Sequence, residues 1–372
     1  MNPVICYSCF ICMLTCSYLA LQIFFRRGLG RMKIPDISSL RSVSVIVPCH
    51  NEEANLPGLF RCLEAQTCPA DQMEIIFVDD RSTDATWDLM NWFASGKPNV
   101  RTIRITTLED EKSPKKNALA QAIRVATGEI ILTTDADTHP GPHWIDSMIR
   151  AFDEETGMVL GYAPYRTDGA YNTLFHKLLA LEYFSMGAIT AASTSLELPS
   201  TCNGANLAYR KSVFEEVGGF GGTAKHLSGD DDLFMHRVSQ RTNWKIAFNG
   251  GRNSAVFNNP PENMRAFFRQ RVRFASKHLA YPKSMIAILS LIYGFYLSLL
   301  VSMVFAFFSP VILGIVIIQL ILKVIGDLCF LIPAQARLES RPLLKIYPLL
   351  LIPHIPYVVL FPLLGQILPK RW

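Results

Sequence analysis

Long uncharged runs occupy both ends of the chain, and shorter apolar runs alternate with amphipathic stretches between them. The first run, Val4 to Phe25, contains 22 residues without a charge. As a helix it would be about 33 Å long, enough to cross a hydrocarbon core of about 30 Å. Basic residues follow this run rather than precede it, which is the opposite of a signal peptide. We therefore expect an uncleaved anchor over residues 1–25, with its basic flank in the cytoplasm.

A second uncharged run is too long for a single span. It contains 39 residues, from Ser284 to Leu322. Proline fits the first turn of a helix but interrupts its interior, so we expect a break at Pro310. The break gives one helix near 285–308 and another near 311–333.

Two charged residues interrupt the second of these helices. Lys323 and Asp327 are four residues apart, so they can pair on one helix face. Unpaired, each would cost roughly 2.5–3.5 kcal/mol at the centre of a span. The last apolar segment, 346–364, contains four prolines, which fits either a kinked span or a segment lying at the interface. Two or three transmembrane helices are thus expected within 284–372.

Between the apolar ends, short β-branched runs alternate with helical patterns. The expected strands are 43–47, 74–78, 100–105 and 130–134, and the expected helices are 54–66, 84–93 and 117–126. This order predicts a parallel sheet with helices on both faces. Ligands of such sheets bind beyond the carboxyl ends of the strands. Three of the four strands end in polar or acidic clusters, which are Cys49–Glu53, Asp79–Asp80 and Asp135–Asp137.

The composition, together with the absence of two nucleotide-binding motifs, excludes several classes of protein. Charged residues make up 18 % of the chain but about 23 % of residues 26–283, close to the quarter usual in soluble domains. This split excludes a disordered chain, a small disulfide scaffold, a coiled coil and a plain cytosolic enzyme. No G-x-G-x-x-G follows the first strand and no G-x-x-x-x-G-K-[ST] occurs, which argues against dehydrogenases and P-loop enzymes.

Six motifs, in order along the chain, resemble those of membrane-bound inverting family 2 glycosyltransferases. They are Val45-Ile-Val-Pro-Cys-His-Asn-Glu-Glu53, Val78-Asp-Asp-Arg-Ser-Thr-Asp84, Lys115-Lys-Asn-Ala-Leu119, Asp135-Ala-Asp137, Gly229-Asp-Asp231 and Gln270-Arg-Val-Arg-Phe274. Each motif is weak alone, but six in the family's order at compatible spacing form a strong signal, and the resemblance covers most of 40–280. The resemblance implies an α/β fold, namely a GT-A (nucleotide-diphospho-sugar transferase) domain with a mostly parallel sheet, flanked by transmembrane helices.

The same resemblance implies how the donor is bound. The nucleotide sugar would be held by Pro48, Glu52, Asp79, Asp80, Lys115, Asp135, Asn203, Gly204, Gln270, Arg273 and Phe274. Asp79 or Asp80 would accept from the uracil N–H, which favours a UDP-sugar such as UDP-glucose. Asp135 and Asp137 would hold Mg²⁺ or Mn²⁺, which shares the pyrophosphate oxygens and stabilises the departing nucleoside diphosphate.

The resemblance assigns the catalytic base to Gly229-Asp-Asp231. The position of Arg237 after the motif favours Asp231 as the base over Asp230 or Asp232. An acceptor hydroxyl is a poor nucleophile, and a well-placed carboxylate can take its proton in the transition state. The alternative reading is that these aspartates cap a helix, and the two roles are compatible.

Some positions leave alternatives open. Phe274 replaces a tryptophan of the family pattern, and Arg81, at a common glycine position, would face either solvent or the phosphates. Arg273 should still meet the pyrophosphate. The basic and aromatic residues of 262–278 are also typical of a helix lying on an anionic membrane surface, and the helical pattern at 171–185 fits a core-facing or a membrane-facing helix equally.

We expect five segments along the chain. They comprise an N-terminal transmembrane anchor (1–25), a basic juxtamembrane linker (26–42), the catalytic domain (43–255), an interfacial amphipathic segment (256–283) and a C-terminal membrane region (284–372). The expected partners are a nucleotide-sugar donor, a bilayer and a lipid-like acceptor hydroxyl, as in a glycolipid, a ceramide, a carotenoid or a polyprenyl phosphate. Nucleic acid is not expected, because the strand ends are acidic.

We expect a multi-pass protein of the cell (inner) membrane whose catalytic domain faces the cytoplasm. Three alternatives are a processive polysaccharide synthase, a catalytically silent nucleotide-sugar-binding membrane scaffold and a phosphosugar nucleotidyltransferase. The sequence leaves open the sugar, the acceptor, the choice between Mg²⁺ and Mn²⁺, and the oligomeric state.

Overall fold

The chain forms two compact units in a computed structural model that describes residues 3–33, 41–107, 113–221, 229, 231–338, 340 and 343–368. The helical unit comprises Met1–Arg31, Asn172–Ala192 and Pro261–Trp372, and the sheet unit comprises Met32–Tyr171 and Ser193–Pro260.

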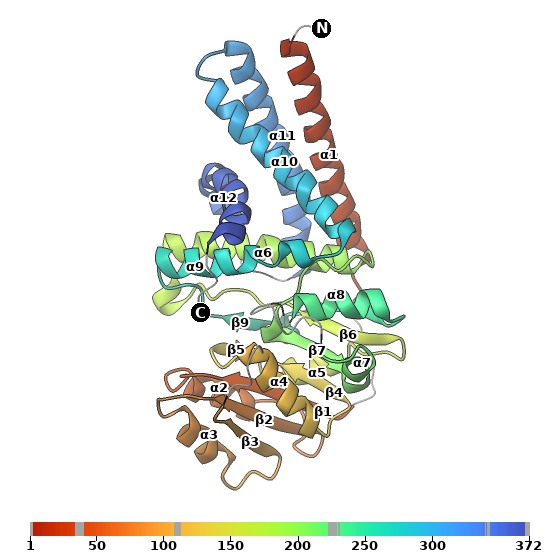
Figure 1. Cartoon of the computed structure of the whole chain (residues 1–372), viewed down its shortest axis with the longest axis vertical. Helices are drawn as coiled ribbons and strands as arrows, with labels where there is room; N and C mark the ends of the chain where they lie inside the picture. Colours follow the sequence, from red (N-terminus) through yellow and green to blue (C-terminus); the bar gives the residue numbers. More distant parts are fainter. Residues whose placement is uncertain are drawn as a thin grey trace. The chain divides into compact units, whose positions relative to one another are not determined.

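A seven-stranded sheet with the order β3-β2-β1-β4-β7-β6-β8 forms the centre of the sheet unit (Figure 1). Its strands are β1 (Val43–Cys49), β2 (Met73–Asp80), β3 (Val100–Ile105), β4 (Ile130–Thr133), β6 (Thr156–Gly161), β7 (Leu207–Arg210) and β8 (Lys245–Asn249). The first four strands pair in parallel, whereas β7 is antiparallel to both β4 and β6. The mostly parallel sheet predicted from the sequence is therefore confirmed. A separate antiparallel ribbon joins β5 (Thr138–Pro140) to β9 (Val256–Asn258).

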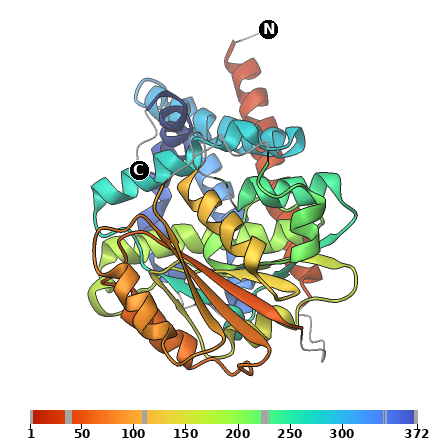
Figure 2. The same ribbon diagram turned by 60° about the horizontal axis from the view of Figure 1, so that its bottom comes forward.

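Helices cover both faces of the parallel strands, as can be followed in Figure 2. The helices of this unit are α2 (Leu56–Glu64), α3 (Thr86–Ala94), α4 (Pro114–Val125), α5 (Trp144–Ile149), α7 (Lys211–Glu216) and α8 (Asp232–Arg241). Val45 and Phe77 share one buried cluster with residues of α2, α3 and α5. Ile46 is adjacent to Val45, and Ile76 is adjacent to Phe77. Their side chains therefore point to the opposite face of the sheet, where α4 contacts β1 and β2. The result is a three-layer α/β/α arrangement.

One buried carboxylate ties β1 and β2 to the turn before β4. Glu74 Oε1 accepts hydrogen bonds from Ser44 Oγ at 2.5 Å, Thr127 Oγ1 at 2.8 Å, Gly128 N at 3.3 Å and the Thr127 amide. A Cβ at Gly128 would lie 2.5 Å from Ser44 N, so only glycine fits this close approach. Burial opposes ionisation, but the hydrogen bonds to the carboxylate outweigh it and lower the pKa of Glu74.

The helical unit contains every helix in the described residues that is long and apolar enough to cross a membrane. These are α1 (Pro3–Arg31), α10 (Lys283–Phe305), α11 (Pro310–Arg337) and α12 (Tyr347–Ile367). α6 (Leu174–Thr194) and α9 (Met264–Ala275) belong to the same unit, except for the last two residues of α6. The segment with four prolines is a continuous helix, with three of them in its interior. Its length and composition therefore suit a span.

The break predicted at Ser309-Pro310 is confirmed. α10 ends at Phe305 and α11 begins at Pro310, where the missing N–H of proline costs nothing. The side chain of Ser309 caps the new helix by accepting from Ile312 N at 3.4 Å.

A buried polar cluster joins three of the long helices. Lys323 Nζ lies 2.5 Å from Asp327 Oδ2, so the predicted pair forms. Tyr18 of α1 donates to Asp327 Oδ1 at 2.6 Å, and Tyr347 of α12 donates to Oδ2 at 2.5 Å. Because each charge finds a partner, α11 can carry both in apolar surroundings. Stacking of Tyr18 on Phe295, with ring centroids 4.1 Å apart, adds α10 to the contact.

Glu74→Gln should lower the free energy of unfolding at pH 7 by about 1.5–3 kcal/mol, because the hydrogen bonds to Glu74 are made to a charged group. The folded-state pKa is lowered, so this contribution is complete above the unfolded pKa, near 4.5, and is lost as pH falls through the folded pKa. Urea unfolding of the full chain in detergent at pH 7 and pH 4 measures the difference. The matched control is Glu64→Gln, in an exposed pair with Lys97, which should change stability by less than about 0.5 kcal/mol. An equal loss from Glu74→Gln at both pH values contradicts this account.

Candidate active site

Hydrogen bonds join the loop after β1 to the loop after β2. Asn51 N donates to Ser82 Oγ at 3.0 Å, and Thr83 N donates to Asn51 Oδ1 at 2.8 Å. His50 Nδ1 lies 2.6 Å from the Asp80 carbonyl oxygen. Asn51 has a φ of 57°, a left-handed conformation that asparagine tolerates better than most residues. The two predicted clusters at the ends of β1 and β2 are thus one connected surface.

Glu52 lies in this surface, beyond Pro48 of β1. Its amide donates to Thr86 Oγ1 at 2.7 Å, and its carboxylate accepts from Asn55 Nδ2 at 2.7 Å. Burial, and then the charges of the aspartates after β4, raise the pKa of Glu52 to about 7. The carboxylates after β1 and β4 therefore act on one another, as expected for neighbouring parallel strands.

The two aspartates that end β2 have different partners. Asp79 is fully buried, and its Oδ1 accepts from Ser82 N at 3.2 Å. Asp80 is bound by the Arg81 guanidinium, through Nε at 2.8 Å and Nη2 at 3.2 Å. The sequence left open whether Arg81 faces solvent or the phosphates, and in the structure its guanidinium pairs with Asp80. Its φ of 58° costs an L-residue about 1–2 kcal/mol, which is a physical reason for glycine at this position in the family pattern.

The Asp135-Ala-Asp137 motif follows β4 directly. Lys115 Nζ, from α4, lies 2.6 Å from Asp135 Oδ1. Burial and the neighbouring charge of Asp135 raise the pKa of Asp137 to about 6. The structure thus brings together the lysine and the two carboxylates that the sequence singled out.

This pair of carboxylates suits a hard cation. Within the described ranges, no group of three or more His, Cys, Asp and Glu residues is placed to hold a metal ion. Asp135 and Asp137 offer oxygen ligands, and Mg²⁺ commonly takes one or two carboxylates and completes its shell with phosphate oxygens and water. The residues therefore fit Mg²⁺ or Mn²⁺ that arrives with a nucleotide, rather than a cage built by protein alone.

Hydrogen bonds made by Gly204, in the loop before β7, link the end of β4 to Asp231, the proposed base. Gly204 O accepts from Thr133 Oγ1 at 2.7 Å, and Gly204 N donates to Asp231 Oδ2 at 3.2 Å. Asn203 caps the short 3₁₀ helix η2 (Gly204–Asn206), its Oδ1 accepting from Ala205 N at 2.9 Å. Asp231 is therefore two hydrogen bonds from Thr133, the last residue of β4.

Asp231, in the base motif, and the adjacent Asp232 have different structural roles. Asp231 is the N-cap of α8, and its Oδ1 accepts from Asp232 N at 2.8 Å. Asp232 is 1 % exposed and accepts from Thr201 Oγ1 at 2.9 Å and Cys202 N at 2.7 Å. Sequence reasoning missed this role of Asp232, and its only signal was a place in the first turn of a helix. Asp230 lies outside the described residues.

Gly229 and Arg237 frame this motif. Gly229 has a φ of 87°, and a Cβ there would lie 2.8 Å from Leu233 Cδ1, so both backbone conformation and space require glycine. Arg237 donates from Nη1 to the Gly219 carbonyl oxygen at 3.1 Å, which ties α8 to the chain after α7.

Gln270, Arg273 and Phe274 lie on α9, in the helical unit. The Arg273 guanidinium carbon is 5.7 Å from the Phe274 ring centroid. The deeply buried arginine of this helix is the neighbouring Arg271, 2 % exposed, which pairs with Glu182 of α6. The sequence did not indicate this pair, because its members are 89 positions apart.

Comparisons with known proteins agree with this fold. The profile of the family described as Glycosyl transferase family 2 matches residues 44–218. The mannosyltransferase PcManGT from Pyrobaculum calidifontis, solved in complex with GDP-Man and Mn²⁺, superposes with a TM-score of 0.61 over 98 % of this chain and 100 % of that one. At 18 % sequence identity, this likeness shows the fold alone.

Two curated relatives match the sequence itself. The probable glycosyltransferase YdaM of Bacillus subtilis is 26 % identical over 254 residues, which cover 68 % of this chain and 58 % of YdaM. The dolichol-phosphate mannosyltransferase of Pyrococcus furiosus is 29 % identical over 154 residues, or 41 % of each chain. The match thus spans about three fifths of the first relative and two fifths of the second.

Asp232→Ala should loosen the loop that carries Asn203 and Gly204. The change leaves the half-buried Cys202 amide without its Asp232 acceptor, at a cost of about 1–3 kcal/mol. Amide hydrogen exchange at Cys202 should accelerate by about 5- to 150-fold, since 1.4 kcal/mol is a factor of ten. Asp71→Asn, at an exposed position of the sheet unit, is the matched control and should leave the exchange unchanged. Unaltered protection in Asp232→Ala means that another contact holds the loop.

Proposed function

Residues 44–218 match the family 2 glycosyltransferases, and we propose that the chain is a glycosyltransferase that moves a sugar from a nucleotide sugar to a hydroxyl of a membrane lipid, with inversion. The observation that carries this proposal is the path from Thr133 through Gly204 to Asp231. It sets a candidate base beside the strand whose end bears the candidate metal ligands. A donor and an acceptor hydroxyl can therefore meet at one place.

On the donor side, the surface formed by the loops after β1 and β2 would bind the nucleoside. Glu52 and Pro48 would lie against it, and Asp79 or Asp80 would read the base edge. A uracil N–H suits a carboxylate acceptor, which favours a UDP-sugar such as UDP-glucose. The Pyrobaculum protein was solved with GDP-Man, so a guanosine donor belongs in any test panel.

Asp135 and Asp137 would hold Mg²⁺ or Mn²⁺, with Lys115 beside them. The cation, when bound, supplies positive charge that stabilises the departing nucleoside diphosphate. Lys115, already paired with Asp135, adds a second positive charge at the same strand end. We place Asn203 and Gly204 near the donor sugar, and Gln270, Arg273 and Phe274 near the pyrophosphate.

Asp231 would take the proton of the acceptor hydroxyl. Its carboxylate accepts hydrogen bonds from Gly204 N and Asp232 N. The same bonds fix the orientation of the side chain. Asp230 is the second candidate for this role.

The acceptor side would be the bilayer. The Pyrococcus relative is named for dolichol phosphate, a lipid, and four helices of this chain suit a membrane. The basic residues at the end of α1, Arg26, Arg27 and Arg31, favour a cytoplasmic catalytic domain at the cell membrane.

A donor panel tests the activity. Purified protein in detergent, given Mn²⁺ or Mg²⁺, lipid extract and UDP-glucose, UDP-N-acetylglucosamine or GDP-mannose, should release nucleoside diphosphate. Asp231→Asn should lower kcat by about 10²- to 10⁴-fold and leave nucleotide affinity unchanged, while Asp71→Asn should behave as the parent protein. Full activity in Asp231→Asn refutes the base assignment, and no release with any donor favours a silent nucleotide-sugar-binding scaffold.

Removing the metal provides a second test. EDTA should abolish release, and added Mn²⁺ or Mg²⁺ should restore it. Asp137→Asn should raise the cation concentration needed for half-maximal activity by about tenfold or more, because it removes one of two charged ligands. Asp71→Asn, at an exposed position of the same unit, is the control and should leave that concentration unchanged. Activity that survives EDTA contradicts metal dependence.

A further inference from the structure

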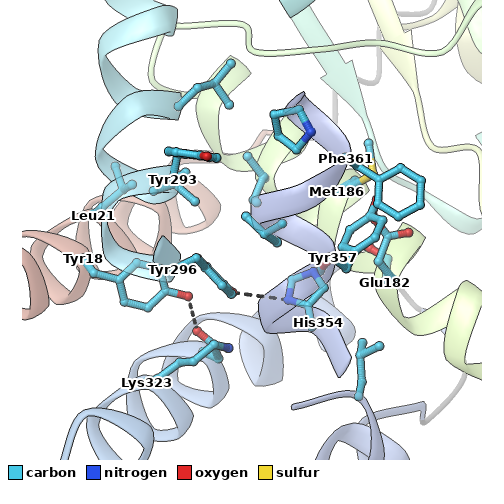
Figure 3. A pocket seen from close by; sticks show the side chains of 18 of the residues that line it. Tyr18, Leu21, Glu182, Met186, Tyr293, Tyr296, Lys323, His354, Tyr357 and Phe361 are labelled. Atoms are coloured by element: carbon cyan, nitrogen blue, oxygen red, sulfur yellow. Dashed lines mark hydrogen bonds and ion pairs between the residues drawn. The ribbon is translucent and has the colours of Figure 1, made fainter. Parts of the chain in front are cut away.

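The helical unit contains a cavity of about 480 Å³, which α1, α6, α9, α10, α11 and α12 line (Figure 3). This volume lies within the range of about 300–1,000 Å³ usual for small-molecule sites. Most of its wall is apolar, with Leu21, Met186 and Phe361 among the side chains that face it. Long aliphatic groups fit such walls.

The charges that line the cavity cancel. Arg271 pairs with Glu182, at side-chain exposures of 2 % and 8 %, and Lys323 pairs with Asp327, at 1 % and 9 %. Both pairs line the cavity, and among the residues that the structure describes no other lysine, arginine, aspartate or glutamate does. Each buried cation is already compensated, so a lipid phosphate would bring an uncompensated negative charge into low-dielectric surroundings. The cavity therefore favours an uncharged occupant.

One polar side chain of the cavity, that of Gln22, calls for a hydrogen-bond donor. Gln22 Nε2 donates to Asp327 Oδ1 at 3.3 Å, which aims the other end of the carboxamide elsewhere. Gln22 Oε1 is buried and accepts no hydrogen bond from any residue that the structure describes. Tyr18 and Tyr347 already donate their hydroxyl protons to Asp327. A buried acceptor without a partner is costly, and an O–H or N–H of a bound molecule would satisfy Gln22.

We propose that this cavity binds an uncharged lipid that carries hydroxyl or amide N–H groups, with one such group at Gln22 and the aliphatic chains along the apolar walls. This inference rests on the proposed function, because it names the class of acceptor: a neutral hydroxylated lipid of the ceramide type rather than a polyprenyl phosphate.

Photo-crosslinking tests the site without requiring activity. The full chain in detergent, without nucleotide sugar, is irradiated with a diazirine-bearing ceramide, and the labelled peptides are mapped by mass spectrometry. Labels should fall on residues that line the cavity, such as Leu21, Met186 and Phe361. Unlabelled ceramide should compete, whereas triacylglycerol, which has no donor, and polyprenyl phosphate, which is charged, should each compete at least tenfold less well.

Substitutions sharpen the test. Gln22→Leu keeps the size of the side chain and should lower ceramide labelling about tenfold. Leu21→Trp should block the cavity and lower labelling further, whereas Leu313→Trp, on a 47 % exposed position of α11 outside the cavity, should leave it unchanged. Retained nucleotide binding in each variant shows that the protein is folded.

The outcomes separate this inference from the proposed function. Labels outside the cavity, equal competition by triacylglycerol, or better competition by polyprenyl phosphate each overturn the proposed occupant, even if sugar transfer is observed. Labelling within the cavity that depends on Gln22 supports the lipid site even if no nucleotide sugar is consumed, and then it is the transfer activity that fails.

Discussion

Parallel pairing of β1 with both β2 and β4 is the constraint on which the candidate active site depends. The register sets Cys49 beside Asp79 and Ile46 beside Thr133, so all three strands end at one edge. A slip of one residue would exchange the two faces of a strand and bury polar groups now held at that edge. The loop contacts, the lysine–carboxylate pair and the link to the base motif all follow from this alignment.

Local patterns account for what the sequence predicted of the fold. Strands β1, β2 and β4 are mostly apolar runs, and β3 alternates apolar with polar residues. Pro310 marks a helix start by its own chemistry. None of these elements needs distant partners to be recognised. By contrast, β7 is four residues long and is a strand because β4 and β6 pair with it from both sides. Such an element has little local signal.

The same distinction applies within the site. The positions of Asp135, Asp137 and Lys115 could be predicted because the strand ends and motifs are local. The structural roles of Asp232 and Arg271 could not, because their partners lie 30 and 89 positions away in sequence. Arg81 was ambiguous for another reason: its pairing with Asp80 depends on a left-handed backbone that is rare for arginine.

The balanced charges of Lys323 and Asp327 have an electrical consequence. Moving one elementary charge through the whole membrane potential is worth about 2.3 kcal/mol per 100 mV. A cation and an anion fixed 2.5 Å apart form a dipole with no net charge, and a neutral occupant adds none. If the occupant is neutral, as proposed, filling or emptying the cavity would move no gating charge, and its occupancy would be independent of the voltage across the bilayer.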